Sequence, residues 1–111
     1  MHKFIFFLLS ITIFTLSSSS AAIYKGQRVF SKKCVICHTN GQATVSSKTE
    51  AQWTKLLTEN GIELSKIHLT NKEAKDSWKY FYSKAYTKKV KHLKDFLIEY
   101  AKDSGNIPAC N

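Results

Sequence analysis

The chain has 111 residues, of which 43% are hydrophobic, and this length suffices for one small domain. It carries 17 lysines and arginines against 8 aspartates and glutamates, which gives a formal net charge of +9 at pH 7. The length excludes a multidomain enzyme, and the positive charge favours steering toward an acidic protein surface or an anionic membrane.

Residues 1–22 have the order of a secretory signal peptide. A short basic start precedes an apolar run over residues 4–16, and small serines and alanines follow. Small residues at Ser20 and Ala22 suit signal peptidase, so we expect cleavage after Ala22 or one residue earlier. The run is short for a membrane span and lacks a charged stop-transfer segment, which favours cleavage over an uncleaved anchor. We expect residues 23–111 to form a periplasmic domain, for which nucleic acid is excluded as a partner.

The stretch that follows, residues 24–33, predicts a short amphipathic helix. Val29 and Phe30 lie three and four residues after Gly26, while lysines, an arginine and a glutamine supply the polar face. Gly26 lowers helix propensity, which leaves two interpretations. Either it lets another helix approach closely, or the first turn is frayed.

Cys34, Cys37 and His38 form the Cys-x-x-Cys-His pattern that is typical of c-type haem attachment. Two thiols at this spacing reach the two vinyl groups of one haem, and the next residue binds the iron as proximal ligand. A thioredoxin-like pair is usually found in a βαβ context, and a zinc site needs a second cysteine or histidine pair, which the sequence lacks. Haem attachment takes place outside the cytoplasm, so the leader and the motif support each other. The sequence predicts one covalent haem c.

The remaining sequence predicts three further helices separated by polar turns. The expected elements are a polar loop over 39–47, a helix opened by a capping box at 49–52 and ending near Asn60-Gly61, a helix opened by a second capping box at 70–73 and running through about Ala85, a last helix from about Lys88 to Lys102, and a tail over 106–111.

Apolar residues mark the expected interior of these helices. One face of the last helix carries Val90, Leu93, Leu97, Tyr100 and Ala101, with Phe96 beside it. The dense aromatics at 78–82 predict core or the wall of a haem pocket. The indole N–H of Trp53 has two interpretations, donation to a haem propionate or simple packing.

Three stretches carry a family pattern. They are Lys25-Gly26-x-x-Val29-Phe30-x-x-x-Cys34-x-x-Cys37-His38-Thr39, Trp53-x-x-x-Leu57-x-x-x-Gly61-x-x-Leu64 and Leu97-Ile98-Glu99-Tyr100. Together they resemble small bacterial members of the class I monohaem cytochrome c family, whose N-terminal glycine and aromatic residue pack against the C-terminal helix. The resemblance implies an all-α, cytochrome c-like domain of three to five helices around one covalently attached haem, with electron transfer as its role.

The second axial ligand departs from that family, which usually supplies a methionine. The sole methionine, Met1, lies in the leader. Two histidines are candidates for the distal iron ligand: His68, after the Trp53 helix, and His92, on the last helix. A vacant or water-held site, or a lysine or tyrosine ligand from 79–86, remains open. Two histidine ligands predict a low-potential carrier, because methionine raises the potential of cytochromes c, whereas an open site predicts binding of carbon monoxide, nitric oxide or peroxide.

Three functions fit this pattern. The first is a periplasmic carrier of single electrons between respiratory proteins, not an enzyme, that meets acidic-faced redox partners and associates peripherally with membranes. The second is a small-ligand-binding cytochrome, because the methionine is missing. The third is an accessory haem subunit of a larger oxidoreductase complex, because the chain is small and Cys110 remains after haem attachment. Cys110 either forms a disulfide with a partner or a second copy, or stays a free thiol without a role.

Overall fold

The computed structural model describes residues 20–108, and these residues form helices and turns. In chain order the elements are α1 (Ser20–Lys33), α2 (Gly41–Val45), α3 (Glu50–Leu69), the 3-10 helix η1 (Lys72–Ser77), α4 (Trp78–Phe81) and α5 (Lys84–Glu99). No strand occurs in this described range, so the predicted all-α class is confirmed.

Two predicted features fall wholly or mostly outside the described residues. The leader covers 1–22, of which only the last three residues are described, and they belong to the first turn of α1. Cys110 also lies outside the described range. Between residues 20 and 108, no helix combines the length and apolarity that crossing a membrane requires.

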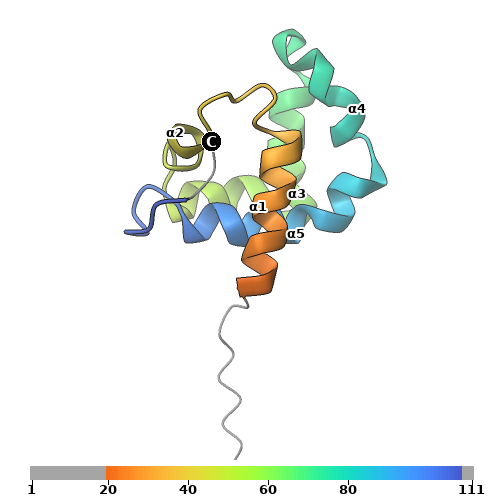
Figure 1. The fold of residues 1–111 in the computed structure, drawn as a ribbon. Helices are drawn as coiled ribbons and strands as arrows, with labels where there is room; N and C mark the ends of the chain where they lie inside the picture. The colour runs from red at the N-terminus through yellow and green to blue at the C-terminus, as the bar shows by residue number, and fades with distance from the viewer. Residues whose placement is uncertain (1–19, 109–111) are drawn as a thin grey trace, which may run out of the picture.

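The main contact of the fold joins the two ends of the domain, because α1 packs chiefly against α5 (Figure 1). Gly26 lies where the two helices cross. A Cβ atom at this position would collide with the carbonyl oxygen of His92 and lie 2.6 Å from the Cβ of Phe96. One turn further on, the rings of Phe30 and Phe96 pack with their centroids 5.6 Å apart. The interpretation of Gly26 as a site of close helix approach is confirmed.

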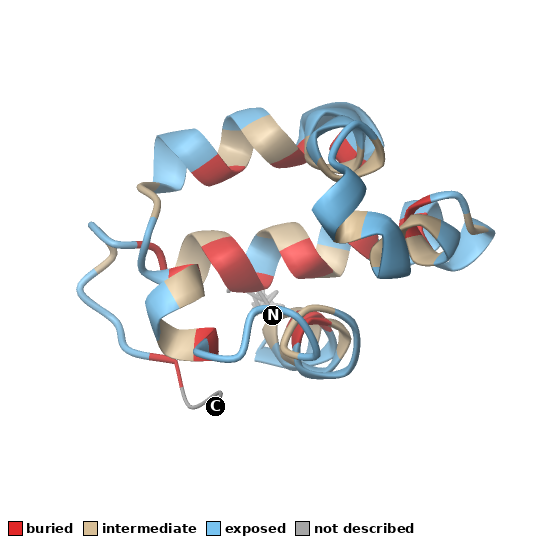
Figure 2. Cartoon of the chain, turned by 90° about the horizontal axis from the view of Figure 1, so that it is seen from above, coloured by how far each residue is buried: buried red, intermediate tan, exposed pale blue. Residues whose placement is uncertain are grey.

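The core lies between α1, α3 and α5, and Figure 2 shows the buried positions on the inward sides of these helices. Its largest fully buried side chains are Tyr86, Phe96, Leu93, Leu97 and Val45. The predicted apolar face of the last helix is confirmed, and Phe96, expected beside that face, has no exposed surface at all.

The helix that begins at Glu50 has the predicted capping box. The Thr49 side chain accepts a hydrogen bond from the Gln52 N–H (3.2 Å), and the Gln52 side chain accepts one from the Thr49 N–H (2.9 Å). The predicted end near residues 60–61 corresponds to a sharp break, where Glu59, Asn60 and Gly61 have φ of 51°, 59° and 68°. After this break the chain is helical again over residues 62–69, a segment that we call the histidine arm because it carries His68.

The single helix predicted from 70–73 to Ala85 is wrong. The Thr70 hydroxyl instead donates back to Lys66 O at the end of α3, and Asn71 caps η1 by accepting from the Glu73 N–H. The hydroxyls of Ser77 and Ser83 donate to carbonyls three residues earlier, at 2.6 Å each. Serine hydroxyls that bond to nearby backbone compete with continuous helix, and the segment is divided into η1, α4 and the start of α5.

Two loops also differ from expectation. The predicted polar loop contains α2, which Asn40 caps by accepting from the Ala43 N–H at 3.0 Å. Of the predicted tail, residues 106–108 are described: Asn106 and Ile107 are exposed, whereas Pro108 is buried and its carbonyl accepts from the Gln42 side chain at 2.9 Å. The preceding turn is tied down as well, through Lys102 N–H donating to Lys48 O at 2.9 Å.

Gly26→Ala is expected to lower the free energy of unfolding by roughly 2 kcal/mol. Alanine favours a helix by about 1 kcal/mol over glycine, but overpacking costs about 1–3 kcal/mol, and here the added atom meets a backbone carbonyl that cannot rotate away. Urea denaturation followed by circular dichroism measures the change. Ser31→Ala, at an exposed position of the same helix, is the control and should stay within about 0.5 kcal/mol of the wild type. Equal stability of the Gly26 variant and the wild type would contradict the close crossing.

Candidate functional site

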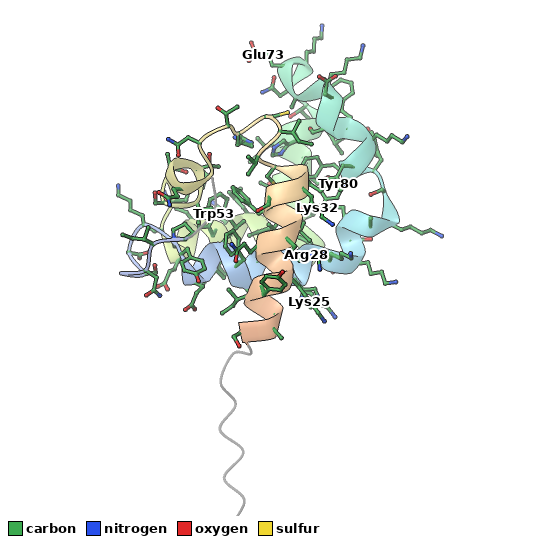
Figure 3. The ribbon with its side chains drawn as sticks, viewed as in Figure 1. Lys25, Arg28, Lys32, Trp53, Glu73 and Tyr80 are labelled. Atoms are coloured by element: carbon green, nitrogen blue, oxygen red, sulfur yellow. The ribbon has the colours of Figure 1, made fainter. Side chains whose placement is uncertain are left out.

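A cavity of about 760 Å³ lies beside the C-terminal end of α1. Sites for small molecules and cofactors have volumes of about 300–1,000 Å³. Figure 3 shows two of the lining residues, Trp53 and Tyr80, on either side of this end of α1. Its apolar walls include Phe30, Trp53, Leu64, Phe81, Leu93 and Leu97. The cavity therefore suits a large, mostly apolar ligand.

The Cys-x-x-Cys-His motif lies on one turn that continues α1 into the cavity wall. The His38 N–H and the Cys37 N–H both donate to Cys34 O, at 2.8 and 3.2 Å. Residues three and four apart share a face of a helical turn, so both cysteines and His38 face the same way, and all three line the cavity. Ile36, between the cysteines, is 75% exposed. The motif thus presents its reactive side chains to the cavity.

The Cys34 thiol is half-buried, and neither Cys34 nor Cys37 forms a disulfide. Burial, with a smaller contribution from Cys37, raises the pKa of Cys34 to about 12. A thiol with this pKa stays protonated at neutral pH, whereas a thioredoxin-like pair depends on a thiolate of lowered pKa. The described residues also lack the βαβ unit in which such pairs usually occur. This environment does not favour thiol–disulfide exchange.

His38 and His68 both line the cavity, with ring centroids 6.2 Å apart and planes 79° apart. Two imidazoles that bind one metal ion from opposite sides have centroids about 6 Å apart, because each metal–nitrogen bond is about 2 Å and each ring nitrogen lies about 1 Å from its ring centre. Desolvation, together with the nearby His68, lowers the pKa of His38. A lowered pKa keeps the His38 imidazole neutral, which is the form that binds metal.

The surroundings of His68 fix the orientation of its ring. Nδ1 lies 2.8 Å from Leu64 O, and because a carbonyl only accepts, Nδ1 is the donor in this contact and Nε2 is the ring nitrogen that the contact does not use. The ring stacks on Phe81, with centroids 4.3 Å apart and planes 27° apart. Histidines that bind metal commonly donate their second ring N–H to a carbonyl in this way. His68 therefore has the second-nitrogen contact expected of a ligand.

The other two candidates from the sequence have different surroundings. His92 is not among the residues that line the cavity, and its backbone carbonyl faces Gly26. Its Nδ1 is buried without a hydrogen-bond partner in the described part of the chain. Trp53 forms part of the cavity wall, but its indole N–H donates to Val45 O at 2.9 Å. The structure favours packing for Trp53 over donation to a haem propionate.

No family model, curated protein or solved structure matches this chain. What the site holds is therefore inferred from its own residues and their geometry.

The donor set fits haem better than a bare metal ion. Over residues 20–108, no group of three or more His, Cys, Asp or Glu side chains is arranged to hold a metal ion. A structural zinc site needs four such ligands, whereas the iron of a haem is already bound by four ring nitrogens and needs only one or two from the protein. The cysteine pair, the two imidazoles with centroids 6.2 Å apart and the apolar cavity fit these requirements.

A buried hydroxyl in the wall also lacks a partner. Among the described residues, Tyr80 Oη is buried and forms no hydrogen bond. Desolvation, with a smaller contribution from Cys34, raises the pKa of Tyr80 to about 12, so the phenol stays protonated at neutral pH. A buried polar group without a partner is unfavourable, so this hydroxyl lowers the stability of the wall in which it lies.

Sequence reasoning did not find the residues that hold His68. The aromatic stretch 78–82 indicated a wall, but its spacing did not single out Phe81, which stacks on His68, or Trp78, which donates to His68 O at 2.7 Å. Leu64 could have been found, because it lies four residues before His68 on the same helical segment and its carbonyl is therefore within reach.

In the folded chain without bound haem, Cys34 is expected to react slowly with iodoacetamide. At about pH 8 a thiol of pKa about 12 is ionised roughly a thousandfold less than one of pKa about 8.5, because the raised pKa retains the proton. Mass spectrometry of peptides from protein produced in the cytoplasm of an expression host measures the labelling of each cysteine. The same protein in urea is the control, and equal rates in both conditions would contradict the buried, protonated thiol.

Proposed function

We propose that this protein is a periplasmic monohaem c-type cytochrome that carries single electrons between respiratory redox partners. The observation that supports this most directly is the pair His38 and His68, whose rings line one apolar cavity with their centroids 6.2 Å apart. The turn that carries His38 also carries the two thiols needed for covalent attachment. Membership of the class I cytochrome c family is part of the proposal, and the packing of α1 against α5 at Gly26 supports it.

Each residue of the site has a separate task in this proposal. Cys34 and Cys37 form the two thioether links. His38, on the same turn, is the proximal iron ligand. His68 is the distal ligand through Nε2, since Nδ1 donates to Leu64 O. When bound, haem supplies an iron that takes up and releases one electron. The apolar walls exclude water and so lower the local dielectric around that charge change.

Ligation by His68 favours electron transfer over the binding of small ligands. If both axial positions are filled by the protein, carbon monoxide or peroxide must displace a side chain before it can bind. A histidine in place of methionine also lowers the reduction potential, so the proposed donor and acceptor belong to the low-potential end of a respiratory chain.

The surface beside the site is positively charged. Lys25, Arg28 and Lys32 are exposed and spaced along one face of α1 (Figure 3), the helix that ends at the haem-binding motif. An acidic partner approaching this face is steered by the whole positive field of the protein. We propose an acidic redox protein as the partner on this side.

Replacing both Cys34 and Cys37 by alanine is expected to abolish covalent haem. The wild type, exported by a host that attaches haem to Cys-x-x-Cys-His motifs, should keep its haem through a denaturing gel, because thioether bonds survive denaturation. A haem stain and the pyridine haemochrome spectrum measure this. Cys110→Ala is the matched control and should keep the haem. A colourless wild type whose two motif cysteines are oxidised to each other would overturn the proposal.

His68→Ala is expected to convert the iron from low spin to high spin. Loss of the imidazole leaves the distal position open, so the reduced variant should bind carbon monoxide readily while the wild type binds it slowly. Optical and paramagnetic-resonance spectra report the spin state. His92→Ala is the control, because His92 does not line the cavity. If the His92 variant changes spin state and the His68 variant does not, the assignment of the distal ligand is wrong.

A further inference from the structure

The histidine arm, residues 62–69, follows a backbone break whose unusual conformation needs support from the surrounding structure. Three successive residues before it, Glu59, Asn60 and Gly61, have positive φ. Glycine adopts left-handed conformations freely and asparagine tolerates them, but they are unfavourable for glutamate, so Glu59 is the strained position of the three. Such a conformation persists only when the surrounding structure holds it in place.

Tyr86, on α5, holds the break. Its side chain is 1% exposed, and its hydroxyl donates to Gly61 O at 2.5 Å in a buried contact. A Cβ atom on Gly61 would collide with this same hydroxyl. The missing side chain at residue 61 and the tyrosine hydroxyl therefore fit together, and this contact fixes where the histidine arm begins.

The same tyrosine is connected to the far end of the arm through one ring. The rings of Tyr86 and Phe81 pack edge to face with centroids 4.9 Å apart, and Phe81 stacks on His68 at 4.3 Å. Trp78 adds a hydrogen bond from its indole N–H to His68 O. The beginning and the end of the arm are thus held by one short stretch of chain, residues 78–86.

From these contacts we infer that Tyr86 is a positioning residue for the distal iron ligand: its hydroxyl, bonded to the Gly61 carbonyl, sets the place of His68 opposite His38. This inference rests on the proposed function, because it assigns His68 to haem iron. Tyr86 is not among the residues that line the cavity, although its ring packs on the lining residue Phe81. It acts on His68 through the backbone break and through the Phe81 ring.

Tyr86→Phe tests this inference, because it removes only the hydroxyl and keeps the ring that packs on Phe81. The net contribution of one hydrogen bond changes an equilibrium by about two- to tenfold. Without the Tyr86 hydroxyl, His68 should dissociate from the iron more often. We therefore expect carbon monoxide to bind the reduced variant faster than the reduced wild type, by up to this factor. We also expect faster amide exchange over residues 62–69 of the haem-loaded protein, measured by mass spectrometry, with no change in α1.

Tyr100→Phe is the matched control. Tyr100 also packs on a core ring, that of Phe96 at 5.3 Å, but lies outside the cavity lining. Removing the Tyr100 hydroxyl should leave both the rate of carbon monoxide binding and the amide exchange of the histidine arm unchanged. If the Tyr86 and Tyr100 variants behave alike in both measurements, the positioning role is overturned.

A second variant keeps the inference testable if Tyr86→Phe does not fold. Trp78→Phe, at a half-buried position, removes the indole N–H that donates to His68 O. Like Tyr86→Phe, it should increase the rate of carbon monoxide binding to the reduced protein. Wild-type rates in this variant would then overturn the inference.

The outcomes separate this inference from the proposed function. A colourless wild type overturns both. A haem-loaded wild type whose spectrum is unchanged by His68→Ala overturns the positioning role and leaves covalent haem in place. A spectrum that responds to His68→Ala, with Tyr86→Phe indistinguishable from Tyr100→Phe, overturns the positioning role alone.

Discussion

The close crossing of α1 and α5 at Gly26 is the contact on which the rest of the structure depends. Because glycine has no side chain, the backbone of α1 lies directly against the His92 carbonyl, and Phe30 then packs on Phe96 one turn later. This fixes where α1 ends, and therefore where the turn that carries Cys34 enters the cavity wall. A larger residue at the crossing would move that turn relative to Leu93 and Leu97, the α5 residues that line the same cavity.

The breaks between helices, rather than the helices themselves, create the cavity. A continuous α3 would carry residues 62–69 away along its axis, whereas the left-handed residues at the break redirect them so that His68 lies near His38. Serine hydroxyls at Ser77 and Ser83 divide the next segment into short pieces. Short elements at different angles pack around a central space, while long parallel helices would fill it with their own side chains.

The sequence predicts most of the framework because local signals agree with the fold at these places. The capping box at Thr49, the glycine crossing and the apolar face of α5 each depend on residues close in sequence or on one strong steric requirement. The segment from Thr70 to Ser83 was predicted wrongly because its serines bond to their own backbone, a choice that the helical pattern does not reveal. The contacts of His68 with Phe81 and Trp78 depend on the angle at the backbone break, which no periodicity encodes.

The residues that line the cavity are spread over the chain from Phe30 to Leu97, and this has a consequence for the order in which the cavity forms. More than half of the sequence separates Cys34 from Leu93, and Pro108 holds α2 only after nearly the whole chain is present. Cys34, Cys37 and His38 therefore emerge from synthesis before the residues of α5 that complete the cavity. The two thiols are therefore accessible while the chain is still unfolded, and the C-terminal helix completes the cavity beside them only afterwards.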